Sequence, residues 1–111
     1  MGMPRHVCPR YQSAAELIGR RWSAAVIRVA LDGPARFSDF RDAVDGLSSR
    51  LLAQRLRELE AAGIISRRPP GGRSLYQLTD KGRALATVVV EIEQWATEWV
   101  VVDEPTGARR R

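Results

Sequence analysis

The 111-residue sequence contains one cysteine and one histidine, and its hydrophobic runs are short. Cys8 alone cannot form a disulfide within the chain, which fits the reducing cytoplasm. Cys8 and His6 are too few ligands for a mononuclear zinc site, so we expect no metal. Apolar runs such as residues 88–90 fall far short of the ~18 residues that a membrane-spanning helix needs, and the N-terminus lacks the hydrophobic segment of a signal peptide. We therefore expect a cytoplasmic protein without a membrane segment.

The sequence also lacks recognisable catalytic groups. It contains no Ser/His/Asp set, no glycine-rich loop that would hold a phosphate, and no carboxylates in the pattern of a general acid and base. We therefore expect that the protein is not an enzyme and takes no cofactor.

What the chain does have is an excess of positive charge, almost all of it arginine. Lysine plus arginine number 18 against 13 acidic residues, a formal net charge of +5. Residues 63–83 hold five basic residues and one acid, whereas residues 84–102 hold three glutamates and no base. A basic surface beside an acidic one is typical of a protein that binds nucleic acid in one orientation. A scatter of solvated charge would give the same counts, so that alternative stays open.

The first part of the chain is predicted to form three short helices. Residues 11–19 repeat apolar residues at helical spacing and end at Gly19. Residues 22–31 do the same, beginning from Trp22. Ser38 is predicted to be the N-cap of the third helix, since a serine hydroxyl can accept a free backbone N–H there.

A fourth helix is predicted from a cap at Ser48 to about Ala62. Its apolar positions have helical spacing and are Leu52, Leu56 and Leu59. The opposite face carries Arg50, Gln54 and Arg57. Two helices joined by a glycine-containing turn fit a helix-turn-helix, although an arginine-rich face is also typical of any soluble helix.

A β-hairpin is predicted directly after this pair of helices. Residues 64–68 and 73–78 form the strands, and the Pro-Pro-Gly-Gly sequence at residues 69–72 forms the turn. Three guanidinium groups flank the turn, those of Arg67, Arg68 and Arg73. A helix-turn-helix followed by such a hairpin is a winged helix, and its arginines suit phosphate contact. A hairpin that merely covers the core is the alternative.

The last helix is predicted to start at Thr79-Asp80 and to run to about Val102. Its apolar residues are spaced three and four apart and are Leu85, Val88, Ile92, Trp95, Trp99 and Val102. A winged-helix core is too small to cover this seam, which predicts a homodimer with Leu17 of the first helix joining the interface. The alternative is a helix that folds back on its own domain.

These elements predict a mainly α fold with a small β-hairpin (α+β), a winged helix-turn-helix with a long C-terminal dimerisation helix. The domain covers residues 11–102, with dimerisation helices at residues 11–19 and 79–102. An N-terminal arm, residues 1–10, precedes it, and a disordered basic tail, residues 103–111, follows.

Six segments carry a resemblance to a known family. They are residues 8–9 (Cys-Pro), 18–23 (Ile-Gly-Arg-Arg-Trp-Ser), 33–40 (Gly-Pro-Ala-Arg-Phe-Ser-Asp-Phe), 46–48 (Gly-Leu-Ser), 56–65 (Leu-Arg-Glu-Leu-Glu-Ala-Ala-Gly-Ile-Ile) and 76–82 (Tyr-Gln-Leu-Thr-Asp-Lys-Gly). In this order and spacing they make residues 8–99 resemble the HxlR family of bacterial winged-helix transcription regulators, which is related to the MarR group. The end of the wing, residues 72–76, is shorter than is usual for that family.

The resemblance implies a non-catalytic homodimer that places its recognition helices in successive major grooves of double-stranded DNA and represses a nearby promoter. It also implies an inducer, either a small molecule or an electrophile, because in some members an N-terminal cysteine senses quinones or oxidants. Arg5 and Arg10 lie close to Cys8 in sequence and favour the reactive thiolate. A structural cysteine without a sensing role is the alternative.

We therefore predict a pseudo-palindromic operator with half-sites about one helical turn, roughly 34–36 Å, apart. The predicted base-reading residues are Ser48, Ser49, Arg50, Gln54 and Arg57. The predicted phosphate contacts are Arg36, Ser38, Arg67, Arg68 and Arg73. A winged-helix module for protein–protein assembly, without a specific operator, is the alternative function.

Overall fold

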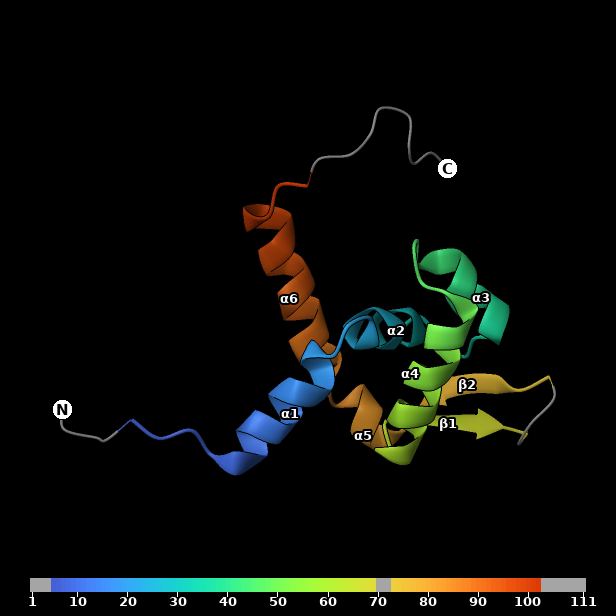
Figure 1. Cartoon of the computed structure of the whole chain (residues 1–111), viewed down its shortest axis with the longest axis horizontal. Helices are drawn as coiled ribbons and strands as arrows, with labels where there is room; N and C mark the ends of the chain where they lie inside the picture. Colours follow the sequence, from blue (N-terminus) through green and yellow to red (C-terminus); the bar gives the residue numbers. More distant parts are fainter. Residues whose placement is uncertain (1–4, 70–72, 103–111) are drawn as a thin grey trace.

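The computed structural model describes residues 5–69 and 73–102 (Figure 1). Along the chain its elements are α1 (Pro9–Gly19), α2 (Ser23–Ala30), α3 (Phe37–Ala43), α4 (Ser49–Ala61), β1 (Ile65–Arg68), β2 (Leu75–Leu78), α5 (Asp80–Arg83) and α6 (Ala86–Trp99). The predicted disordered tail, residues 103–111, lies outside the described residues. The predicted fold class, mainly α with one hairpin, is confirmed.

The core lies where α2, α3 and α4 meet the hairpin. Ile27, Phe40 and Leu52 are fully buried there, and the hairpin adds Ile65 and Leu78 at its base. β1 and β2 are antiparallel, and Ile65 pairs with Leu78. A period-two strand pattern places these two side chains on the core face, so the wing is anchored at its base. Residues 70–72 of the predicted turn lie outside the described residues.

Two predicted helix starts differ from the structure. α1 begins at Pro9 rather than at residue 11, because proline suits the first helical position, where its missing N–H costs nothing. Ser38 is not the N-cap of α3, which begins at Phe37. The Asp39 carboxylate accepts the backbone N–H of Arg36 at 2.8 Å and caps the helix from inside.

Trp22 is not part of α2, contrary to the sequence prediction. Its backbone has φ +76°, a left-handed conformation that is rare for a bulky residue. This turn separates α1 from α2 and brings the indole to within about 4 Å of the position that a side chain on Gly46 would occupy. The guanidinium of Arg21 lies 5.1 Å from the centre of the Trp22 ring. The residues between α1 and α2 therefore pack on the turn between α3 and α4.

The predicted long last helix is two helices. α5 ends at Arg83, and the N–H of Leu85 donates to the Gly82 carbonyl at 2.9 Å, a tighter turn than an α-helix makes. α6 ends at Trp99 rather than Val102, because Val100 is extended and starts a run of three β-branched valines. No helix within residues 5–69 or 73–102 is long and apolar enough to cross a membrane.

Candidate nucleic-acid interface

α4 presents the polar face that the sequence predicts. The Ser48 hydroxyl accepts the N–H of Leu51 at 3.1 Å, which confirms Ser48 as the N-cap. The predicted core positions, Leu52, Leu56 and Leu59, are buried. The five predicted base-reading residues are exposed: Ser48, Ser49, Arg50, Gln54 and Arg57. Their side chains are therefore accessible from solvent on one face of α4, close to its capped N-terminus.

Three of the predicted phosphate contacts come together between α3 and the wing. Arg36, Ser38 and Arg73 line one cavity of about 380 Å³. Reciprocal backbone hydrogen bonds between Ala35 and Tyr76, 2.9 and 2.7 Å long, hold the start of α3 against β2. This bridge joins the two segments on which Arg36 and Arg73 lie, so two arginines far apart in sequence line the same cavity.

The two arginines of β1 differ in their surroundings. Arg68 is exposed at the end of the strand, as predicted for a phosphate contact. Arg67 instead forms a 3.4 Å ion pair with Glu60 and lies 5.9 Å from the centre of the Tyr76 ring. Arg67 is therefore partly committed to joining the wing to α4.

A cluster of polar and charged side chains around Glu58, on the side of α4 that faces the start of α2, was not predicted from the sequence. The Glu58 carboxylate accepts hydrogen bonds from Gln54 at 3.2 Å and Arg55 at 3.1 Å, and Arg20 lies 3.3 Å from it. Arg55 has a side chain only 11% exposed and also donates to the carbonyl of Arg21 at 2.7 Å. The spacing of Gln54, Arg55 and Glu58 at four and three residues was the available signal.

These contacts change the ionisation of Glu58. Partial burial opposes its charged form, but the hydrogen bond from Gln54 and the charges of Arg55 and Arg20 outweigh it and lower the pKa of Glu58 below its ordinary value of 4.5. Glu58 is therefore a stable anion at neutral pH. Its charge joins α4 to the junction of α1 and α2.

α6 carries the exposed apolar seam that the sequence predicts. On α6, Trp95 and Trp99 are 61% and 66% exposed, and Val88 and Ile92 are also exposed. Of the other predicted interface residues, Val102 beyond the end of α6 is exposed, and Leu85 before its start and Leu17 of α1 are half-buried. Val89, which lies off the seam, is buried and docks α6 on the domain. Figure 1 shows α6 extending away from the body of α2, α3, α4 and the hairpin. A large apolar stripe on such a helix is typical of an interface.

Arg28 of α2 forms an ion pair with α6. Its guanidinium bonds Asp32 at 3.1 Å within α2 and Glu93 of α6 at 3.2 Å. The hydrogen bond to Asp32, and after it the contacts with Glu93, raise the pKa of Arg28 above its ordinary value. Arg28 thus joins the helix that carries the apolar seam to a helix of the core.

Cys8 is exposed and occupies the N-cap position of α1. Its carbonyl accepts the N–H of Gln12 at 3.0 Å. α1 therefore begins directly after Cys8. The thiol is reachable from solvent, which a sensing cysteine needs.

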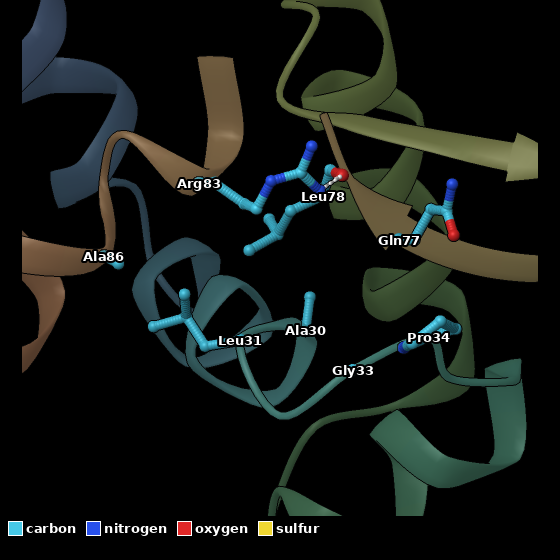
Figure 2. Close-up of a pocket in the computed structure, with 8 residues that line it drawn as sticks. All are labelled: Ala30, Leu31, Gly33, Pro34, Gln77, Leu78, Arg83 and Ala86. Carbon is cyan, nitrogen blue, oxygen red and sulfur yellow. Dashed lines mark hydrogen bonds between the residues drawn. The ribbon is translucent and has the colours of Figure 1, made fainter. Parts of the chain in front are cut away.

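A cavity of about 450 Å³ lies where α2, β2, α5 and α6 meet (Figure 2). Figure 2 shows Arg83 and Leu78 on one side of it, and Ala30 and Leu31 on the other. Arg83 already donates to the Leu78 carbonyl at 2.9 Å and pairs with Asp80. A ligand that entered here would have to compete with these partners.

The comparisons with known proteins bear on the whole of this arrangement. Residues 17–104 match the HxlR-like helix-turn-helix family, which is most of the chain. The chain belongs to that family. The HxlR-like match covers α2, α3, α4, the wing and α6 together, so the elements of the candidate interface and the exposed seam fall within one family domain.

Relatives in Bacillus subtilis are named as HTH-type transcriptional regulators. YvaP is 42% identical over 97 residues, covering 85% of this chain and 90% of YvaP. YodB is 37% identical over 100 residues, covering 87% of this chain and 89% of YodB. The HxlR-like chain therefore matches these regulators over nearly their full lengths.

Solved structures of related regulators share the fold. The reduced form of YodB from B. subtilis superposes with a TM-score of 0.73 at 36% identity, covering 89% of this chain and all of YodB. The redox regulator HypR in its oxidized form gives a TM-score of 0.78 at 32% identity, covering 86% of this chain and all of HypR. YodB has also been solved in a quinone-bound form, with a TM-score of 0.73 at 39% identity, covering 83% of this chain and all of that YodB chain.

Proposed function

We propose that this HxlR-like protein is a sequence-specific DNA-binding transcriptional repressor. The observation that carries the proposal is the capped helix α4 with its exposed polar face, in a domain where Arg36 and Arg73 line a second basic site between α3 and the wing. Arginine can pair with guanine, and glutamine with adenine, in the major groove. The wing and the start of α3 would hold phosphates and set the register.

We propose that the repressor acts in the cytoplasm as a homodimer joined through α6 and α1. The exposed seam around Ile92, Trp95 and Trp99 is the supporting observation. A two-fold dimer would read a pseudo-palindromic operator with half-sites about 34–36 Å apart. No observation favours the alternative of a protein–protein assembly module.

The first test is binding of the reduced protein to duplex DNA from its own upstream region. Fluorescence anisotropy at about 150 mM salt would compare this duplex with a scrambled one, since salt controls the non-specific contribution. A preference of a hundredfold or more is expected. Equal affinity for the two duplexes, and for duplexes selected from a random pool, would support the assembly module instead.

Arg50→Ala is expected to weaken operator binding by about 1–3 kcal/mol and to relax the preference at one base pair. Arg50 is exposed in the first turn of α4, the part of a recognition helix that contacts bases. Arg73→Ala is the matched control, because it removes the same charge from the wing. It should weaken all sequences alike and lower the salt slope by about one. Equal losses on operator and random DNA for Arg50→Ala would contradict a base-reading role.

We propose that oxidants or electrophiles release the repressor through Cys8. The exposed thiol at the start of α1 and the similarity to YodB and HypR support this proposal. Treatment with diamide or a quinone is expected to lower operator affinity, and Cys8→Ser should abolish the response while leaving affinity of the reduced protein unchanged. An undiminished response in Cys8→Ser would overturn it.

A further inference from the structure

Glu58 contacts a residue that is predicted to recognise DNA bases, in addition to joining α4 to the junction of α1 and α2. Gln54 is one of the exposed predicted base-reading residues, and its side-chain nitrogen donates to Glu58 Oε2 at 3.2 Å. We propose that Glu58 is a specificity-determining positioning residue, which holds the Gln54 amide in one orientation for base recognition. This inference rests on the proposed DNA-binding function.

The amide group of glutamine has two faces with different hydrogen-bonding character. It offers a carbonyl oxygen as acceptor and two N–H groups as donors. Only the carboxylate form of Glu58 is acceptor-only, so Gln54 must turn its nitrogen toward it. One N–H of Gln54 is then occupied, and its oxygen and second N–H remain. That acceptor and donor are the pair that recognises adenine.

Glu58 can impose this orientation because it is itself held from two sides. Its other oxygen, Oε1, accepts from Arg55 at 3.1 Å and lies 3.3 Å from Arg20. Arg55 is in turn fixed by its 2.7 Å bond to the carbonyl of Arg21. The Glu58 side chain is 28% exposed, so the carboxylate is partly withdrawn from solvent. A glutamine held by such an anchored partner loses less freedom when it binds DNA.

Glu58→Gln tests the inference because a neutral amide can offer either its oxygen or its nitrogen to Gln54. Both orientations of Gln54 then become compatible with the protein, and discrimination at its base pair should fall. Glu60→Gln is the matched control: it removes the same charge from the same helix, but Glu60 pairs with Arg67. Each variant removes one negative charge, and Glu60→Gln also releases Arg67, a predicted phosphate contact, so the control is expected to change affinity for all sequences alike and not the discrimination at any base pair.

The experiment first selects an operator with the wild-type full chain from a pool of randomised duplexes. Anisotropy titrations on duplexes with single base-pair changes then give a discrimination profile, and Gln54→Ala identifies the base pair that Gln54 reads. At that pair the wild type should discriminate roughly tenfold or more. Glu58→Gln should reduce the discrimination at this position to about threefold or less and leave discrimination at the other positions unchanged. Glu60→Gln should leave discrimination unchanged at every position.

A double mutant separates positioning from a general structural role. In a Gln54→Ala background, Glu58→Gln should have no further effect on that base pair. Glu58→Asp is the second variant if Glu58→Gln does not fold. It keeps the charge but shortens the side chain by one methylene, which withdraws the carboxylate from Gln54, so discrimination at the same base pair should again fall. A profile of Glu58→Gln equal to that of Glu60→Gln, a uniform loss at all positions, a gain in discrimination, or no position read by Gln54 would overturn the inference. Selection of no operator by the wild type would instead remove the proposed function on which it rests.

Discussion

Trp95→Asp is expected to convert the proposed dimer to a monomer and to lower operator affinity by roughly 10²- to 10⁴-fold. Trp95 is 61% exposed in the single chain and lies in the middle of the α6 seam, so a charge there leaves the domain intact but cannot be buried against a second copy. A monomer binds one half-site and loses the gain in effective concentration from linking two binding modules. Light scattering and anisotropy on a two-half-site duplex measure the two effects.

Gln94→Asp is the matched control for Trp95→Asp. Gln94 is exposed on α6, and at 100° per residue it lies well away from the line of Ile92, Trp95 and Trp99. It introduces the same charge on the same helix and should leave a dimer with wild-type operator affinity. A dimeric Trp95→Asp protein, or a monomer that binds the operator as tightly as wild type, would contradict the proposed interface.

Gly82→Ala is expected to destabilise the fold by about 3 kcal/mol. A Cβ at Gly82 would lie 2.1 Å from the carbonyl oxygen of Ile64 and 3.0 Å from Leu78 Cδ2. The first contact is with backbone that is held at the base of the wing, because the Ile64 carbonyl also accepts the N–H of Thr79 at 3.0 Å. Neither group can move without disturbing the join between α4, the hairpin and α5.

Thermal unfolding followed by circular dichroism measures this effect. A loss of about 3 kcal/mol should lower Tm by more than roughly 10 °C in a domain of this size. Gly19→Ala is the control, because Gly19 is the last residue of α1 and nothing lies within 4 Å of its added Cβ. It should leave Tm unchanged or slightly raised. A Gly82→Ala protein that melts within about 2 °C of wild type would show that the close contact is relieved without cost.

The sequence predicted those elements whose signals are local. The Ser48 cap and the leucines at Leu52, Leu56 and Leu59 lie within one helix, and both were confirmed. The predicted start of α3 was wrong because the Asp39 carboxylate, rather than the Ser38 hydroxyl, accepts the free backbone N–H at the start of the helix.

The break between α5 and α6 was missed because it involves a contact between residues that are distant in sequence. Gly82 packs against the Ile64 carbonyl, and no spacing within residues 79–102 reports that contact. In the candidate site, exposure of the α4 face followed from helical periodicity. The partners of Glu58 and Arg67 did not, because they require knowing that α1 and β1 pass beside α4.

The angle between α6 and the rest of the domain would set the spacing of the two recognition helices in the proposed dimer. α6 is attached to the domain through its first half and middle, by Val89 and the Arg28–Glu93 pair, while Trp95 and Trp99 lie in its second half. If each recognition helix lies about 17 Å from the two-fold axis, half of one helical turn of DNA, a rotation of each domain by about 5° about the centre of the dimer moves that helix by about 1.5 Å. The two halves together then shift by about 3 Å, close to the 3.4 Å rise of one base pair. A change of a few degrees where α6 joins the domain would therefore be enough to move both recognition helices out of register with the operator half-sites.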